Sequence, residues 1–242
     1  MKMSNVLKSR LVLGGAIAAL AALALGGQLQ LRRRCPSGGA PALAEGALAT
    51  LGGLRSLAAE VVWFRLDRLQ EEGRYVELAQ LANALAHLEP HTPEVWSYAA
   101  WNLAYNVSVM MPDAESRWRW VEAAISLLRD EGLRINPRSR EIMRELAWLF
   151  QLKIGGNLDS AAPAYRRIWR EKIDDVRRRG AWDELAMDPA EMKAVERETG
   201  FDDWGDPMLS AIYWARRGGF AEIARQASAI YARGRAGASS AK

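Results

Sequence analysis

The fold of this chain is decided by residues 73–103, which read GRYVELAQLANALAHLEPHTPEVWSYAAWNL. Apolar residues recur three and four positions apart over 78–88, which is the spacing of one face of an α-helix. Gly73 comes before this stretch and Pro90 after it, and both residue types mark helix ends. Pro93 then opens another helix as its first residue. The stretch therefore predicts two helices separated by short turns.

The rest of the domain, residues 54–233, continues this helical texture. Asp188-Pro189 followed by Glu191 predicts a helix start with a capping box, and Asp206-Pro207 predicts another capped start. No stretch shows the sustained alternation of a strand, and no Asn-Gly pair marks a hairpin. We therefore expect an all-α domain, with six or more helices after the first.

The opening stretch resembles the tetratricopeptide repeat (TPR) family. Gly73 and Tyr75 stand where that family has its inter-helix glycine and the aromatic residue after it. Leu88 and Pro90 stand at its unit end, and Trp96 stands at its opening tryptophan. The resemblance implies a divergent TPR-like solenoid of helical hairpins, each packed on its neighbours. It also implies a protein-interaction or scaffold role.

The other units depart from the family's length. The unit that ends at Pro137 takes 47 positions from Pro90, whereas a standard repeat takes about 34. We expect the additional residues, about a dozen, to be inserted near Val109–Glu115. Residues 142–171 and 207–231 resemble further degenerate units. Together with an apolar N-terminal segment, these units also resemble bacterial membrane-anchored repeat proteins of unassigned activity.

The N-terminal segment, residues 1–34, is predicted to be a membrane anchor with basic flanks. Residues 11–31 contain no charge and span 21 positions, about the length that crosses a bilayer. A cleavable signal peptide is the competing interpretation, but its small-x-small site would fall inside the apolar run or far beyond it. Residues 35–53, rich in Pro, Gly and Ala, are a predicted spacer, and residues 234–242 are a predicted disordered tail.

The charge of the chain is divided unevenly. Residues 1–34 hold six basic residues and no acidic one, and the remainder holds 27 Lys and Arg against 29 Asp and Glu. The domain therefore lacks a nucleic-acid footprint. Basic residues flank the apolar segment equally, so the positive-inside rule leaves the orientation open. We expect a single-pass protein of the inner (cytoplasmic) membrane with an extracytoplasmic domain, because short N-terminal tails usually stay cytoplasmic.

Residues suited to metal binding or catalysis are sparse. His87 and His91 have the spacing of two ligands on one helix face, but Pro90 between them ends the helix, so we expect no metal. Cys35, the single cysteine, lies beside the anchor and excludes an intrachain disulfide. No nucleophile motif, phosphate loop or dinucleotide fingerprint occurs. We expect no cofactor and no enzymatic activity.

Aromatic residues are densest over residues 96–106. On a helix, Trp96 falls on one face with small apolar residues, and Trp101 and Tyr105 fall on another. Core packing of both faces is the simpler interpretation. The sharper hypothesis is that the second face lines a groove for a protein partner, since aromatic and arginine side chains dominate such interfaces. The predicted partner-binding residues are Trp101, Asn102, Tyr105 and Arg119.

Two further hypotheses stay open. One is a structural subunit of a larger membrane assembly, because Gly14-Gly15 and Gly26-Gly27 would let the N-terminal helix pack closely on other spans. The other is an enzyme acting on envelope glycans, which would take its carboxylates from the non-repeat stretch 174–206. The candidate carboxylates of that enzyme are Asp183, Glu184 and Asp203.

Overall fold

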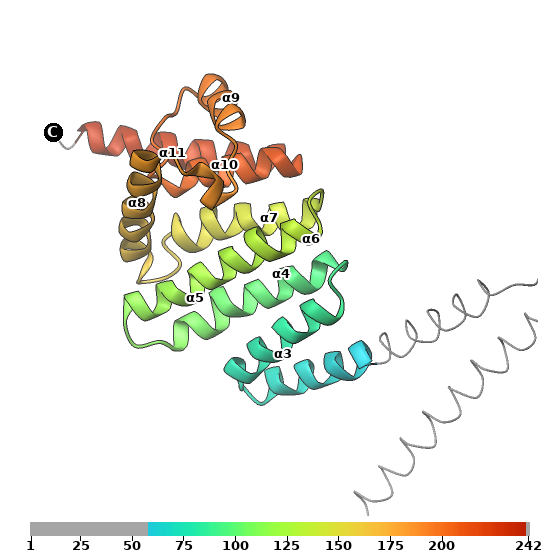
Figure 1. Cartoon of the computed structure of the whole chain (residues 1–242). Coiled ribbons are helices and arrows are strands. Elements are labelled where there is room, and N and C mark those ends of the chain that lie inside the picture. Colours follow the sequence, from blue (N-terminus) through green and yellow to red (C-terminus); the bar gives the residue numbers. More distant parts are fainter. Residues whose placement is uncertain (1–57, 241–242) are drawn as a thin grey trace, which may run out of the picture. The chain divides into compact units, whose positions relative to one another are not determined.

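The computed structural model describes residues 58–240 (Figure 1). All regular secondary structure in this range is helical, which confirms the all-α class. Within the same residues, no helix is both long enough and apolar enough to cross a membrane. The predicted anchor at 1–34, its apolar span at 11–31 and the spacer at 35–53 lie outside the described residues.

The helices follow one another with few intervening residues. In the labels below, η marks a π-helical or 3₁₀ segment. The described elements are a helix over 58–71, α3 (Tyr75–Leu88), α4 (Pro93–Trp101), η1 (Asn102–Val107), η2 (Ser108–Met110), α5 (Ala114–Ser126), η3 (Leu127–Gly132), α6 (Leu133–Ile135), α7 (Arg140–Trp148), η4 (Leu149–Ile154), α8 (Ala162–Arg179), η5 (Trp182–Leu185), α9 (Pro189–Thr199), α10 (Pro207–Gly218) and α11 (Ala221–Ser240).

Consecutive helices fold back on one another as hairpins. The first helix and α3 meet at Gly73, whose φ of +69° is a left-handed conformation that glycine adopts without strain. Residues 111–113 join η2 to α5, and residues 219–220 join α10 to α11. In addition, α4 contacts α7, and α7 contacts α10. The first helices α4, α7 and α10 are therefore neighbours in that order, although α5 and α6 lie between α4 and α7 in the view of Figure 1.

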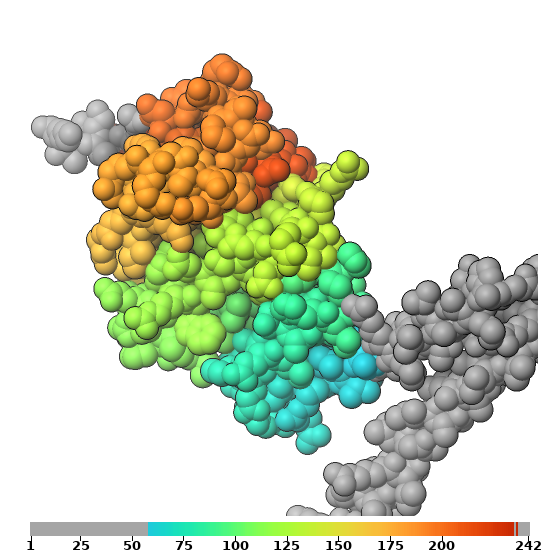
Figure 2. Space-filling model, in the orientation of Figure 1, coloured from blue at the N-terminus to red at the C-terminus, as the bar shows by residue number. Residues whose placement is uncertain are grey.

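Aromatic side chains fill the spaces between these hairpins. The largest fully buried ones are Trp96, Trp169, Trp214, Tyr165, Tyr213 and Phe150. The Nε1 of Trp96 donates a hydrogen bond to the carbonyl oxygen of Pro90 at 2.9 Å, and the Nδ2 of Asn136 donates to the same oxygen at 2.7 Å. These two hydrogen bonds to the Pro90 oxygen connect α4, and the turn before α7, to the segment that follows α3. In Figure 2, the side chains of successive hairpins meet on the face shown.

Helices α4, α9 and α10 begin at the three prolines that the sequence predicted as first-turn residues. At α9, the Asp188 carboxylate accepts a hydrogen bond from the backbone N–H of Ala190 at 2.8 Å. The predicted capping box is not completed there. Glu191 instead forms an ion pair with Arg217 of α10, at 3.1 Å. The start of α9 is thus fixed by its cap and by a tertiary contact.

The expected insertion near Val109–Glu115 is not a long loop. Val109 belongs to η2 and Glu115 to α5, and the turn between these elements is only residues 111–113. The additional length is taken up by longer helices, which contain the π-helical segments η1 and η3. A π-helical turn accommodates extra residues without breaking the helix, which is why the insertion left no loop signal.

The stretch 174–206, which has no repeat pattern, completes α8 and then forms η5 and α9. Gly180 ends α8 in the left-handed conformation, with a φ of +69°. Buried Met192 and Val195 face the domain, and α9 contacts α10. At the other end, α11 continues as a helix to Ser240, where the sequence predicted disorder from residue 234 onward. Packing on α10 starts this helix, which then continues through Gly234 and Gly237 despite their low helix propensity.

Candidate partner-binding face

Two neighbouring helices repeat the same local geometry. Each of α4 and α7 has nine α-helical residues, and each continues directly into a six-residue π-helical segment, η1 or η4. Trp101 ends α4 and Trp148 ends α7, so the two tryptophans hold equivalent positions 47 residues apart. Because α4 contacts α7 and η1 contacts η4, these equivalent positions come from adjacent helices.

Both tryptophans are open to solvent. Trp101 is 41% exposed and Trp148 is 36% exposed. One turn further along each helix stand Tyr105, which is partly buried, and Leu152, which is exposed. Positions four apart share a helix face, so each helix presents a tryptophan with a second large side chain beside it. We refer to Trp101, Tyr105, Trp148 and Leu152 as the tryptophan face.

The rings of the tryptophan face are held by neighbouring groups. Trp101 and Tyr105 stack, with ring centroids 5.9 Å apart and planes inclined at 28°. The guanidinium carbon of Arg144 lies 4.9 Å from the Trp148 ring centre, a cation–π contact. Lys153 Nζ lies 5.3 Å from the ring centre of Tyr105 and connects η4 to η1. Burial raises the pKa of Tyr105, so its hydroxyl stays neutral.

A buried ion pair lies next to this face. Lys153 Nζ is 2.6 Å from Asp159 Oδ2, and both side chains are almost fully buried. The Tyr165 hydroxyl donates to the same carboxylate at 3.0 Å, and Arg117 lies 3.3 Å from it. Burial acts to raise the pKa of Asp159, but the hydrogen bonds from Lys153 and from the backbone of Ala161 outweigh it and hold the pKa at about 2. The network fixes η4 against α5 and α8.

Glu145 is a buried carboxyl without a partner. Its residue exposure is 7%, and among the described residues no hydrogen bond or ion pair reaches its side chain. Burial raises its pKa to about 7; the positive charge of Arg144 opposes that shift and the negative charge of Glu141 adds to it. Glu145 lies one turn before Trp148, and its charge also raises the pKa of Tyr105.

Of the four predicted partner-binding residues, the structure brings Trp101 and Tyr105 together on the surface. Trp96 is fully buried, so core packing applies to that tryptophan and not to Trp101. Arg119 is exposed on α5, the second helix of the same hairpin. Sequence reasoning missed Trp148 and Glu145. The 47-residue correspondence between α4 and α7 could have indicated Trp148, because it pairs that residue with Trp101, but it pairs Glu145 with Tyr98 and gives no signal for the carboxyl.

Asn102 is placed differently from its prediction, because it is 0% exposed and does not line a surface. Its Nδ2 donates to the carbonyl oxygen of Tyr98 at 2.9 Å, and its Oδ1 accepts from the Nδ2 of Asn106 at 2.7 Å. These bonds support the transition from α4 to η1. Because the Asn102 amide is used up in hydrogen bonds within its own helix, the residue has a structural role and does not contact a partner.

Two of the three carboxylates that the glycan-enzyme hypothesis would use form ion pairs with arginines. Asp203 accepts two hydrogen bonds from Arg170, at 2.9 and 3.0 Å, and Glu184 accepts two from Arg179, at 2.5 and 2.8 Å. These arginine contacts lower the pKa of both carboxyls, which disfavours a general acid. Asp183 lies in η5, where its backbone carbonyl oxygen accepts a hydrogen bond from the N–H of Ala186 at 2.9 Å.

The two histidines are not brought together as metal ligands. The His87 Nδ1 lies 2.8 Å from the carbonyl oxygen of Asn83, and its Nε2 lies 3.1 Å from Glu131. His91 falls in the turn between α3 and α4. Within the described part of the chain, no cluster of three metal-ligating side chains occurs.

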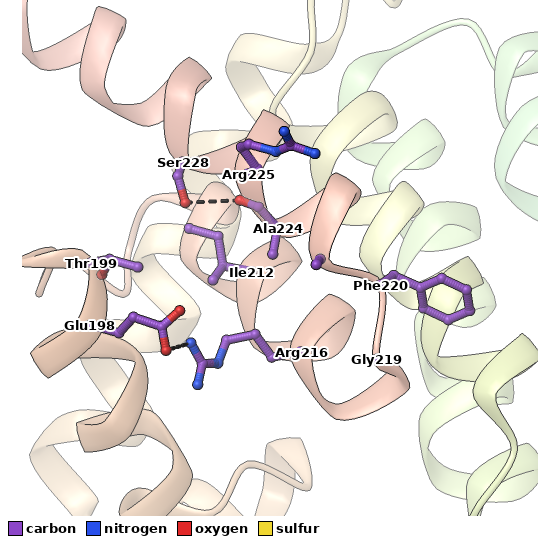
Figure 3. A pocket seen from close by; sticks show the side chains of 10 residues that line it. Glu198, Thr199, Ile212, Arg216, Gly219, Phe220, Ala224, Arg225 and Ser228 are labelled. Atoms are coloured by element: carbon purple, nitrogen blue, oxygen red, sulfur yellow. Dashed lines mark hydrogen bonds and ion pairs between the residues drawn. The ribbon is translucent and has the colours of Figure 1, made fainter.

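A pocket of about 400 Å³ lies between α9, α10 and α11 (Figure 3). Its charged side chains are already paired: Arg216 with Glu198 across the opening, and Arg225 with Glu222 along its own helix. The Ser228 hydroxyl donates to the carbonyl oxygen of Ala224 at 2.8 Å. The side chains of Arg216, Arg225 and Ser228 are therefore already partnered within the protein.

Comparison with protein-family models, with curated proteins and with solved structures finds no match to this chain. The described residues define an all-α protein of helical hairpins with an exposed aromatic face. The basis for a function is therefore the geometry of the tryptophan face and of the groups beside it.

Proposed function

We propose that this chain is a membrane-anchored protein-interaction module, a scaffold component of a bacterial cell-envelope complex. Its hairpins would form a divergent TPR-like solenoid, in which the first helices line the binding surface. The proposal is supported by the adjacency of α4, α7 and α10 and by the repeat-like residues around Gly73 and Trp96. It does not require catalysis or a cofactor.

The observation that carries this proposal is the repeated exposure of Trp101 and Trp148 at equivalent helix positions. Large apolar rings left in water at matched places mark an interaction surface more strongly than scattered ones do. Tryptophan, tyrosine and arginine are the residue types that contribute most at protein interfaces. Tyr105 and Arg144 stand beside the two tryptophans and supply the other two types.

The membrane part of the proposal rests on residues 11–31, which would anchor the chain in the inner membrane. Residues 35–53 would then act as the spacer between the anchor and the helical domain. The domain would lie on the extracytoplasmic side. A partner bound at the tryptophan face would thereby be held close to the membrane.

The experiment is a comparison of full-length proteins isolated in mild detergent after crosslinking in membranes. Trp101→Ala/Trp148→Ala should lose, by at least about tenfold, a partner that the unaltered protein retains in stoichiometric amount. The matched control is Phe64→Ala, which removes a ring that is 73% exposed on the first helix. Retention of the partner by the double variant, or its loss from the control to the same degree, would contradict the proposal.

A further inference from the structure

Glu145 lies where a ligand of the tryptophan face would meet it. It stands on the same side of α7 as Trp148, one turn earlier, and it acts electrostatically on Tyr105 of η1. The residue is 7% exposed, and its carboxylate has no hydrogen-bond or ion-pair partner among residues 58–240. The carboxylate oxygens are not among the fully enclosed, unpartnered atoms of the described residues, so the head reaches the surface while the stem is buried. A carboxylate held in this way can receive an incoming cation.

The two cations that contact rings of the tryptophan face are already engaged. Arg144 forms an ion pair with Glu141 and stacks on Trp148. Lys153 is paired with Asp159. Neither cation neutralises Glu145 through a direct contact, so the face keeps an unmatched acidic group.

One further acidic residue lies on α4. Glu94, in the first turn of that helix, is exposed and has no ion pair among the described residues. Aromatic rings beside an unpaired carboxylate are the chemistry that binds an alkylammonium or guanidinium group.

We propose that the tryptophan face binds a basic peptide segment of the partner protein, with one lysine or arginine head directed to Glu145. The alkyl stem of that side chain would lie against Trp101, Tyr105 and Trp148, and the head would replace the missing partner of the carboxylate. This inference rests on the proposed function, because it names the chemistry of the partner that the same face binds.

The test uses full-length protein in nonionic detergent and three labelled, end-blocked peptides. The probes are GLAXALG with X as Arg, Gln or Glu, and binding is followed by fluorescence anisotropy. The Arg peptide should bind at least about tenfold more tightly than the Gln peptide, and the Glu peptide should bind most weakly. Glu145→Gln should remove the preference for Arg. Glu115→Gln, which alters an acidic residue in the first turn of α5, is the matched control and should retain the preference.

The outcomes separate this inference from the proposed function. If Trp101→Ala/Trp148→Ala weakens all three peptides while Glu145→Gln changes none, the face binds peptides but the basic-segment inference is overturned. Equal binding of the Arg and Glu peptides, or no binding of the Arg peptide at millimolar concentration, also overturns it. Peptide binding that is unchanged in Trp101→Ala/Trp148→Ala contradicts the proposed function itself.

Discussion

Trp101 and Trp148 occupy the same place in two adjacent helices: each ends a nine-residue α-helix and stands immediately before a six-residue π-helical segment. Both remain about two-fifths exposed, at 41% and 36%. In contrast, Trp96 on the opposite side of α4 is fully buried. One helix thus separates a tryptophan that stabilises the fold from one that is available to a partner.

This separation predicts opposite effects of two tryptophan substitutions. Trp96→Ala should lower the free energy of unfolding by about 3–5 kcal/mol, because it leaves a large cavity in the core. It also removes the hydrogen bond to Pro90. Trp101→Ala should change the same quantity by less than about 1 kcal/mol. Chemical unfolding of the full-length protein in detergent, followed by circular dichroism, measures both. A loss of several kcal/mol in Trp101→Ala would place that ring in the core instead.

Asn102 should behave as a structural residue. Asn102→Ala leaves the carbonyl oxygen of Tyr98 and the side chain of Asn106 without their partner inside the helix bend. We expect the free energy of unfolding to fall by about 1–3 kcal/mol. Any effect on partner binding should disappear when the variant is assayed well below its melting temperature. Weaker binding with unchanged stability would instead support the direct contact that the sequence predicted.

The ion pair of Lys153 and Asp159 should be sensitive to the removal of one member. Lys153→Met keeps the side-chain volume but leaves a buried carboxylate beside Tyr165. Breaking a buried pair in this way costs about 3–5 kcal/mol. Thermal unfolding should show the loss. As a control, Arg167→Met breaks the exposed pair with Glu171 on α8 and should cost less than about 1 kcal/mol.

Glu145 predicts a particular pH dependence of stability. Its pKa rises from 4.5 to about 7 on folding, so the folded chain binds the proton more tightly than the unfolded chain does. The contribution of this group is therefore most favourable below pH 4.5 and is lost as the pH rises through 7. The loss amounts to about 3 kcal/mol.

The measurement is the free energy of unfolding in urea at pH 5 and at pH 8, for the unaltered protein and for Glu145→Gln. The variant should lack this part of the pH dependence and should be the more stable of the two at pH 8. An identical pH dependence in both proteins would show that the carboxyl titrates normally. A bound cationic peptide should reduce the difference, because it stabilises the ionised carboxylate.

Local features of the chain were predictable from the sequence because their causes are local. The starts at Pro93, Pro189 and Pro207 follow from the fixed φ of proline, and the turn at Gly73 follows from a left-handed backbone. The all-α class follows from the spacing of apolar residues. No distant contact was needed for any of these.

The remaining features depend on contacts between distant residues. Asn102 and Tyr105 share an expected helix face, but the π-helical segment η1 turns the amide inward and leaves the ring near Lys153. Glu145 resembles an ordinary solvated acid in the sequence, and it is buried only when α7 packs against its neighbouring helices. Half of the candidate site, namely Trp101 and Tyr105, could be predicted. The other half, Trp148 and Leu152, lies on α7 and η4, and predicting it requires knowing that these elements pack beside α4 and η1.

The repetition of one tryptophan on adjacent helices also sets a spacing for the partner. Packed helices lie about 8–10 Å apart, and a polyproline II segment, which has three residues per turn, advances about 3.1 Å per residue. A segment in that conformation that crosses from Trp101 to Trp148 therefore meets equivalent rings about every third residue. The partner's recognition motif should accordingly have a three-residue period, with its anchoring side chains at positions i and i+3.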